Sequence, residues 1–161
     1  MSDRFARVHD GVEVALEAGE VGFLSDVLGV LAGLGDPADD AGAARLSPPV
    51  YIDDPDADDE WRRFAGGELS SARRADRSSF ELVVQSASEG PVVMSLEEAS
   101  AFMRVLNEAR LVLAARWGIE GADDYEALRP EASDALAYLG WLLAELAELL
   151  GADLGSPPVG G

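Results

Sequence analysis

The spacing of apolar residues along the chain predicts a short sheet near the amino terminus. Apolar and polar residues alternate over residues 12–16, which is the period of a strand with one buried face, and residues 5–8 form a second apolar segment. An Asp-Gly pair at residues 10–11 separates the two segments and predicts the turn of a β-hairpin. Residues 92–94 follow a Gly-Pro break and predict a strand that can add to this hairpin.

Helical spacing begins directly after the hairpin. Apolar residues over residues 17–34 recur every three or four positions, and the Gly and Pro that follow are typical of a helix end. Residues 35–47 predict a flexible acidic loop, and residues 46–55, with three prolines, predict an extended connector. Residues 55–87 predict a long polar helix, which a Gly-Gly pair near its middle is expected to weaken or divide in two.

Two further helices are expected in the second half of the chain. Ser95 and Glu98 form the S-x-x-E capping box of a helix that runs to about Trp117, where Gly118 is placed to end it. A turn follows this helix. Pro130 then fits the first position of a last helix that ends near residue 151.

The pattern as a whole predicts one mainly helical domain. We expect four to five helices over residues 1–151, with a small antiparallel β-hairpin or three-stranded sheet on the amino-terminal side. The total of 161 residues is the length of a single domain that can bury a core. Residues 152–161, rich in Gly and Pro, predict a disordered tail. The longest apolar run, residues 135–144, is far shorter than the roughly 20 residues needed to span a bilayer, so we expect no membrane contact.

Composition and charge exclude several classes of function. The chain has 31 acidic and 12 basic residues, and its net charge of -19 opposes binding to the phosphates of nucleic acid. It contains no cysteine, so disulfides, thiolate catalysis and cysteine-ligated metals are excluded. The first ten residues are charged and lack the apolar core of a signal peptide, which predicts a cytoplasmic protein.

No catalytic, cofactor or metal site is expected. The single histidine, His9, lies in the predicted hairpin turn with no second ligand or positioned partner. Residues 53–60 contain six carboxylates, but an EF-hand loop starting at Asp53 would place Asp58 where it needs glycine and Phe64 where it needs glutamate. We interpret these carboxylates as the acidic first turn of a helix, which complements the helix dipole. The chain is therefore not expected to be an enzyme.

A basic segment stands out within this acidic protein. It contains five arginines, Arg62, Arg63, Arg73, Arg74 and Arg77, and only two acidic residues lie between them. These arginines can pair with the neighbouring carboxylates of residues 53–60, contact an acidic partner protein, or bind nucleic acid. Because the overall field repels phosphate, we favour internal pairing or a protein contact.

Arg110 interrupts an apolar stripe on the capped helix. The other members of the stripe recur at helical spacing and are Leu96, Ala99, Met103, Leu106, Leu113 and Trp117. The guanidinium either reaches past its neighbours to water or is buried and paired. If it is buried, we expect a carboxylate partner from Glu145 or Glu148 of the last helix, or from the Asp53-Asp54 pair of the connector.

Three motifs spread over the chain carry a resemblance to a known family. They are RLSPPVY at residues 45–51 with Asp53 and Asp54, LNEARL at residues 106–111 with Gly118 and Ile119, and LAY at residues 136–138. With these motifs the chain resembles, nearly end to end, an actinobacterial domain-of-unknown-function family labelled oxidative stress regulator (AosR-like), encoded near the Clp protease adaptor. The resemblance implies a cytoplasmic regulator that acts through protein contacts. A thiol mechanism is attached to this label, but this chain departs from it because it contains no cysteine.

Two hypotheses of function follow from the sequence. The first is a non-enzymatic regulatory protein that binds another protein, in transcription or stress response, with a homodimer left open. Its contact surfaces would be the last helix, with the interface-type residues Tyr138, Trp141 and Leu142, and the connector, with Pro48, Pro49, Tyr51, Asp53 and Asp54. The alternative is a transcriptional regulator that binds DNA directly through residues 62–77, which the net charge disfavours. Asn107 and Arg110 belong to the central motif of the resemblance and are candidates for interaction in either case.

Overall fold

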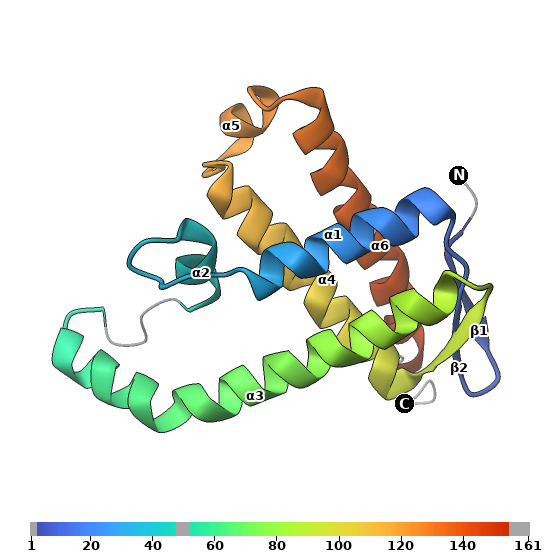
Figure 1. Ribbon diagram of the computed structural model, residues 1–161, viewed down its shortest axis with the longest axis horizontal. Helices are drawn as coiled ribbons and strands as arrows, with labels where there is room; N and C mark the ends of the chain where they lie inside the picture. Colours follow the sequence, from blue (N-terminus) through green and yellow to red (C-terminus); the bar gives the residue numbers. More distant parts are fainter. Residues whose placement is uncertain (1–2, 48–51, 155–161) are drawn as a thin grey trace, which may run out of the picture.

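The fold is mainly helical, with a small sheet at the amino-terminal side, as the apolar pattern predicts. The structure, a computed structural model, describes residues 3–47 and 52–154. In chain order (Figure 1) the elements are β1 (Phe5–Val8), β2 (Gly11–Val14), α1 (Ala18–Ala32), α2 (Ala41–Leu46), α3 (Pro55–Ala87), β3 (Val92–Ser95), α4 (Leu96–Arg116), α5 (Ala122–Glu126) and α6 (Pro130–Leu154).

The three strands form one antiparallel sheet in the order β1-β2-β3, which confirms the predicted hairpin and its third strand. Phe5 pairs with Val14, and Val12 pairs with Met94. The side chains of Val12, Val14 and Met94 are fully buried, so one face of the sheet belongs to the core. A Cβ atom at Gly11 would collide with the main-chain carbonyl of Met94, so the close approach of β2 to β3 at this position requires glycine.

Helix α4 is the centre of the fold and packs against α6, α3, α2 and α1. Its start is the predicted capping box: the Glu98 N–H donates to Ser95 Oγ and the Ser95 N–H donates to Glu98 Oε1, both at 3.0 Å. Gly118, with φ of 72°, follows its end in a left-handed conformation. Helices α4 and α6 diverge from the sheet toward α5, and α1 crosses them (Figure 1).

Residues 35–47 are not the flexible loop that the sequence predicts, because they contain α2. The carboxylate of Asp40 caps this helix by accepting the Gly42 N–H at 2.9 Å. Gly42, Ala43 and Leu46 are buried, and α2 lies against α4. Six residues are too few to be stable alone, so this helix depends on that packing.

Three other boundaries differ from the sequence prediction. Helix α3 continues through Gly66 without the expected division, because a single helix can tolerate glycine at a modest cost. The segment between α4 and α6 contains the short helix α5. Helix α6 reaches Leu154, so residues 152–154 are helical and not part of the predicted tail. The rest of that tail, residues 155–161, lies outside the described residues.

Helix α6 buries an apolar face against α4. Leu139, Leu142 and Leu146 are fully buried, mainly through contact with α4. Over residues 3–47 and 52–154, no helix is both long enough and apolar enough to cross a bilayer.

Candidate functional site

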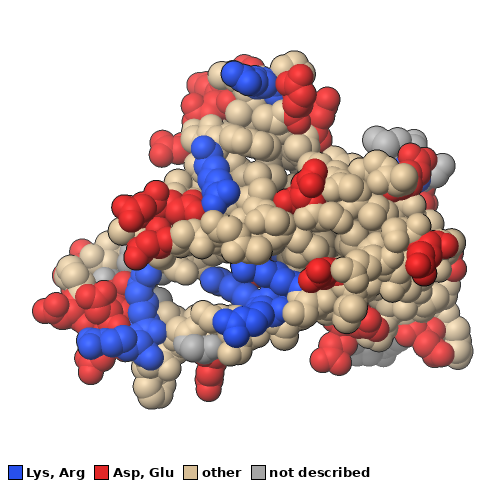
Figure 2. All heavy atoms as spheres, viewed as in Figure 1, with Lys and Arg blue, Asp and Glu red and all other residues tan. Residues whose placement is uncertain are grey.

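A groove between α3 and the helices α1 and α2 is lined by three of the twelve arginines of the protein. Its cavity volume is about 880 Å³. One wall is the α3 face with Arg73, Arg74 and Arg77, and the opposite wall is largely apolar, with Leu28, Ala32, Leu34, Ala43 and Leu46. Figure 2 shows basic atoms clustered in this hollow, with separate groups of acidic atoms on the surface around it. We call it the arginine groove.

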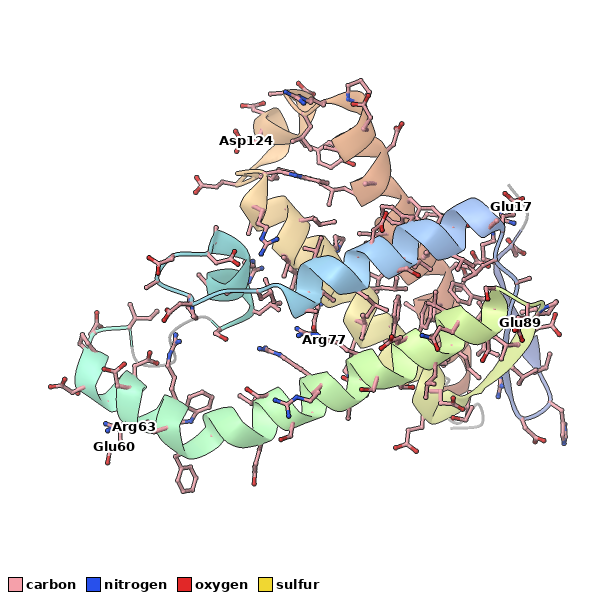
Figure 3. All side chains as sticks on the ribbon, viewed as in Figure 1. Glu17, Glu60, Arg63, Arg77, Glu89 and Asp124 are labelled. Atoms are coloured by element: carbon pink, nitrogen blue, oxygen red, sulfur yellow. The ribbon has the colours of Figure 1, made fainter. Side chains whose placement is uncertain are left out.

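Two of these arginines share one buried carboxylate, Glu108 of α4. Arg77 donates from Nε and Nη2 to Glu108 Oε2, at 3.2 and 2.9 Å (Figure 3 labels Arg77). Arg73 places Nε 3.9 Å from Glu108 Oε1. Glu108 is 8% exposed, so its charge is balanced by guanidinium groups and not by bulk water.

The same arginines bind the carboxyl ends of α1 and α2. Arg77 Nη1 donates to the Leu31 carbonyl at 3.4 Å, and Arg73 Nη2 donates to the Leu46 carbonyl at 2.6 Å. Free carbonyl groups carry the negative end of the helix dipole, and α1 has no basic residue of its own in its last turn. The arginines of α3 therefore hold both helix ends at the edge of the groove.

Sequence reasoning missed Glu108, although a signal was present. Val105 lies three positions before Glu108 and Val112 lies four positions after it, and both are buried, so helical spacing places Glu108 on the same buried face of α4. Glu108 also belongs to the LNEARL motif. Glu108 therefore lies within a second apolar stripe of α4, beside the stripe that Arg110 interrupts.

The remaining arginines of the basic segment are placed differently. Arg62 donates from Nε to Asp58 Oδ2 at 2.9 Å and from Nη2 to the Ser47 carbonyl at 2.7 Å. Arg63 is exposed and reaches only the Asp59 carbonyl, at 3.4 Å. Arg74 is exposed and, among the described residues, has no hydrogen-bond or salt-bridge partner. Pairing with the carboxylates of residues 53–60 is thus confirmed for Arg62, whereas Arg73 and Arg77 pair with Glu108 instead. Arg74 is the groove residue left open among the described residues.

The predicted pairing of Arg110 is wrong. Its side chain is exposed and donates from Nη2 to Asn107 Oδ1 at 3.1 Å. Glu145 instead accepts the Phe5 N–H at 2.9 Å, and Glu148 is exposed. The physical reason is the orientation of α4 about its own axis. The face that carries Val105 and Ala109 points into the core, so Arg110 lies at the edge of the buried face.

We therefore predict a small effect for Arg110→Ala. An exposed contact between residues three apart on one helix contributes little, so the loss in the free energy of unfolding should be below about 1 kcal/mol. Urea denaturation of the variant beside the wild type measures it. A loss of about 3 kcal/mol or more would show that the guanidinium is buried in solution.

The other proposed contact surfaces are only partly available. Pro48, Pro49 and Tyr51 lie outside the described residues, Asp53 is exposed, and Asp54 caps α3 by accepting the Ala57 N–H at 3.1 Å. On α6, Leu142 is fully buried and Trp141 is half-buried, so these residues serve the core rather than a free surface.

Tyr138 of α6 also has an internal role. Its hydroxyl donates to Glu20 Oε2 at 2.6 Å, and Arg4 Nε lies 2.8 Å from Glu20 Oε1. Burial, and then the hydrogen bond to Glu20, raise the pKa of Tyr138 well above its ordinary value. Burial alone would raise the pKa of Glu20, but hydrogen bonds from Tyr138, the Glu17 main chain and Arg4 lower it. The three side chains join the amino terminus, α1 and α6.

Asp40 makes the position of α2 sensitive to acid. Its carboxylate accepts from Arg116 Nη2 at 2.7 Å and from the N–H groups of Gly35 and Gly42 at 3.0 and 2.9 Å. The hydrogen bond from Arg116, followed by that from Gly35, holds the pKa of Asp40 well below its usual range.

We predict that α2 loosens in acid before the rest of the fold. A carboxyl group with a lowered pKa in the folded state contributes stability above its ordinary pKa of about 3.9, and this stability is lost as pH falls below that value. Amide hydrogen exchange of residues 41–46, expressed as protection relative to an unfolded chain and followed from pH 6 to pH 2, measures the change. In Asp40→Asn the exchange of these amides should already be fast at pH 6. Equal protection in both proteins at pH 6 would contradict this account.

A metal ion requires histidine or acidic side chains that are grouped around one point. Residues 3–47 and 52–154 hold no group of three histidine, aspartate or glutamate side chains arranged to bind an ion. His9 is exposed in the hairpin turn, with Nε2 3.7 Å from Asp10 Oδ1.

Comparison with known proteins gives a family without a known activity. A family model described as "Domain of unknown function (DUF2017)" matches residues 2–150. No curated protein and no solved structure matches the chain.

Proposed function

The chain belongs to this family of unknown function, DUF2017, and we propose that it is a non-enzymatic, cytoplasmic regulatory protein that acts by binding another protein. The arginine groove is the proposed contact surface, and an acidic segment of the partner is its occupant. The motifs shared with the actinobacterial oxidative stress regulator type support a role in transcription or stress response.

The observation that carries the proposal is the set of guanidinium groups facing an apolar wall. Arg73, Arg74 and Arg77 line one cavity in a protein whose net charge is -19. Each guanidinium has five N–H donors. Arg73 and Arg77 use only some of theirs in hydrogen bonds to other described residues, and Arg74 donates no hydrogen bond to a described residue. Planar guanidinium groups bind carboxylates in a fork geometry, which favours an acidic polypeptide over a neutral one.

The alternative of direct DNA binding has weaker support. Arg62, Arg73 and Arg77 already bind carboxylates or helix-end carbonyls. Figure 2 shows acidic atoms around the groove, and these would repel the phosphates of a duplex. An acidic peptide brings far fewer charges to that rim.

Charge reversal at Arg74 tests the proposal. Arg74→Glu removes a groove cation without breaking a contact seen among the described residues, so folding should be unaffected. Arg63→Glu is the matched control, because Arg63 is equally exposed on α3 and lies at its amino-terminal end, away from Arg77 (Figure 3). Each protein is used as bait in lysate of the native cell at 150 mM salt, with mass spectrometry of what it retains.

We expect one partner protein to be retained by the wild type and by Arg63→Glu and to be lost with Arg74→Glu. Equal retention by all three proteins would move the contact surface away from the groove. Retention of nucleic acid that depends on Arg74 and survives 150 mM salt would favour the DNA-binding alternative.

A further inference from the structure

The arginine groove continues into a second, more apolar pocket beneath the first half of α3. This pocket has a volume of about 380 Å³ and is lined by Trp61, Leu69 and Gly66 together with Arg62. It shares Leu46, Ser47, Ser70 and Arg73 with the arginine groove, so the two hollows form one trough along α3. We call the second part the anchor pocket.

The length of the trough indicates the kind of occupant. Its lining runs from Trp61 to Gln85 of α3, which is about 36 Å at the helical rise of about 1.5 Å per residue. A small molecule would fill only a part of this distance. An extended polypeptide of about 11 residues would cover it, at about 3.3 Å per residue.

The anchor pocket supplies the apolar half of the recognition. Leu69 is 46% exposed and Trp61 is half-buried, so both present apolar surface that an incoming side chain would cover. A Cβ atom placed on Gly66 meets nothing within 4 Å, so the pocket is open above this glycine. The charged half of the trough lies about 12 Å along α3, around Arg74.

We propose that the partner carries an acidic stretch and, about four residues away in an extended segment, one bulky apolar side chain that enters the anchor pocket. The carboxylates bind Arg74 and the free donors of Arg73 and Arg77. The apolar side chain packs on Trp61, Leu69 and Gly66. This inference rests on the proposed function and specifies the partner chemistry at the same surface.

Selection from a random library of displayed 16-residue peptides, with the full chain as target at 150 mM salt, tests this pattern. Peptides from the enriched pool are then synthesised, and their binding is measured by fluorescence anisotropy. We expect the pool to be net acidic and to share an aromatic or aliphatic residue at a fixed spacing from its acidic residues. A pool of basic or neutral peptides would overturn the inference.

Filling the anchor pocket separates its contribution from that of the arginines. Gly66→Leu adds a side chain inside the pocket and should weaken the selected peptides about tenfold or more, the weight of one buried apolar anchor. Gly66→Ala is the matched control: it adds the same helical preference, fills little space and should leave affinity within about twofold. Both variants should melt at or above the wild-type temperature. Leu69→Gln instead replaces an apolar wall of the pocket with a polar one and should also weaken binding. This variant tests the anchor pocket even if Gly66→Leu does not fold.

The outcomes distinguish the inference from the proposed function. Binding that needs Arg74 but is unchanged in Gly66→Leu and Leu69→Gln would overturn the anchor and leave the proposed function standing. Failure of the selection to yield any peptide that depends on Arg74 would count against the proposed function itself. A wild-type dimer in light scattering that Gly66→Leu dissociates would assign the trough to a second copy of this chain and overturn the partner inference.

Discussion

Phe102→Ala is expected to lower the free energy of unfolding by about 3–5 kcal/mol, the largest loss that we predict for a single substitution. The Phe102 side chain is fully buried in α4 and contacts rings from two other parts of the chain. Its ring stacks on Phe80 of α3, with centroids 4.3 Å apart, and meets the edge of Phe5 of β1 at 5.9 Å. The substitution would leave a cavity where sheet, α3 and α4 meet, and both aromatic contacts would be lost.

Urea denaturation, followed by circular dichroism, measures this loss against a control on α3. Phe64 is 90% exposed, so Phe64→Ala should change stability by less than about 0.5 kcal/mol. A domain of this size has about 5–15 kcal/mol of stability in total, so this loss would be a large fraction of it. A loss below about 1 kcal/mol would mean that the core in solution is not packed around this ring.

Glu108→Ala is expected to cost about 2–3 kcal/mol. Removing one partner of a fully buried ion pair costs about 3–5 kcal/mol, and the value is reduced here because the side chains of Arg77 and Arg73 are 24% and 34% exposed. Without the carboxylate, the two neighbouring guanidinium groups of α3 would lose their shared counter-charge. Glu97→Ala, an exposed acid on the first turn of the same helix, is the control and should cost less than about 0.5 kcal/mol.

A second variant at this position, Glu108→Gln, should lower stability but strengthen peptide binding. With Glu108 replaced by Gln, Arg73 and Arg77 lose their internal carboxylate and become available to an acidic peptide in the groove. We expect Glu108→Gln to be less stable than the wild type and to bind such a peptide more tightly, by anisotropy. If both stability and affinity are unchanged, the carboxylate does not control these arginines.

Elements that depend on neighbouring residues were predictable from the sequence. The capping box of Ser95 and Glu98 uses groups three residues apart, and Gly118 ends α4 through its own backbone conformation. The alternation over residues 12–16 likewise predicted β2 because a strand with one buried face has a period of two. Each of these signals acts within a single turn or strand, so no distant contact was needed to identify it.

Helix α2 shows where local signals were insufficient. Its capping residue Asp40 is bound by Arg116, which lies 76 residues away in the sequence. Glycine, proline and aspartate are common in loops and begin this segment, so residues 35–47 resemble a loop until α4 is present to bury Ala43 and Leu46.

The sequence by itself determined that the body is mainly helical, that α4 is amphipathic and that five arginines lie in one segment of α3. It did not determine which face of α4 is buried, because two apolar stripes occur on that helix at the same helical spacing. The tertiary structure decided between them by packing α1, α2, α3 and α6 around α4. That packing buries Glu108 and leaves Arg110 at the surface. A buried carboxylate needs a cationic partner, so Arg73 and Arg77 turn inward toward Glu108. Arg74, the residue directly after Arg73 on α3, keeps its charge open to the groove.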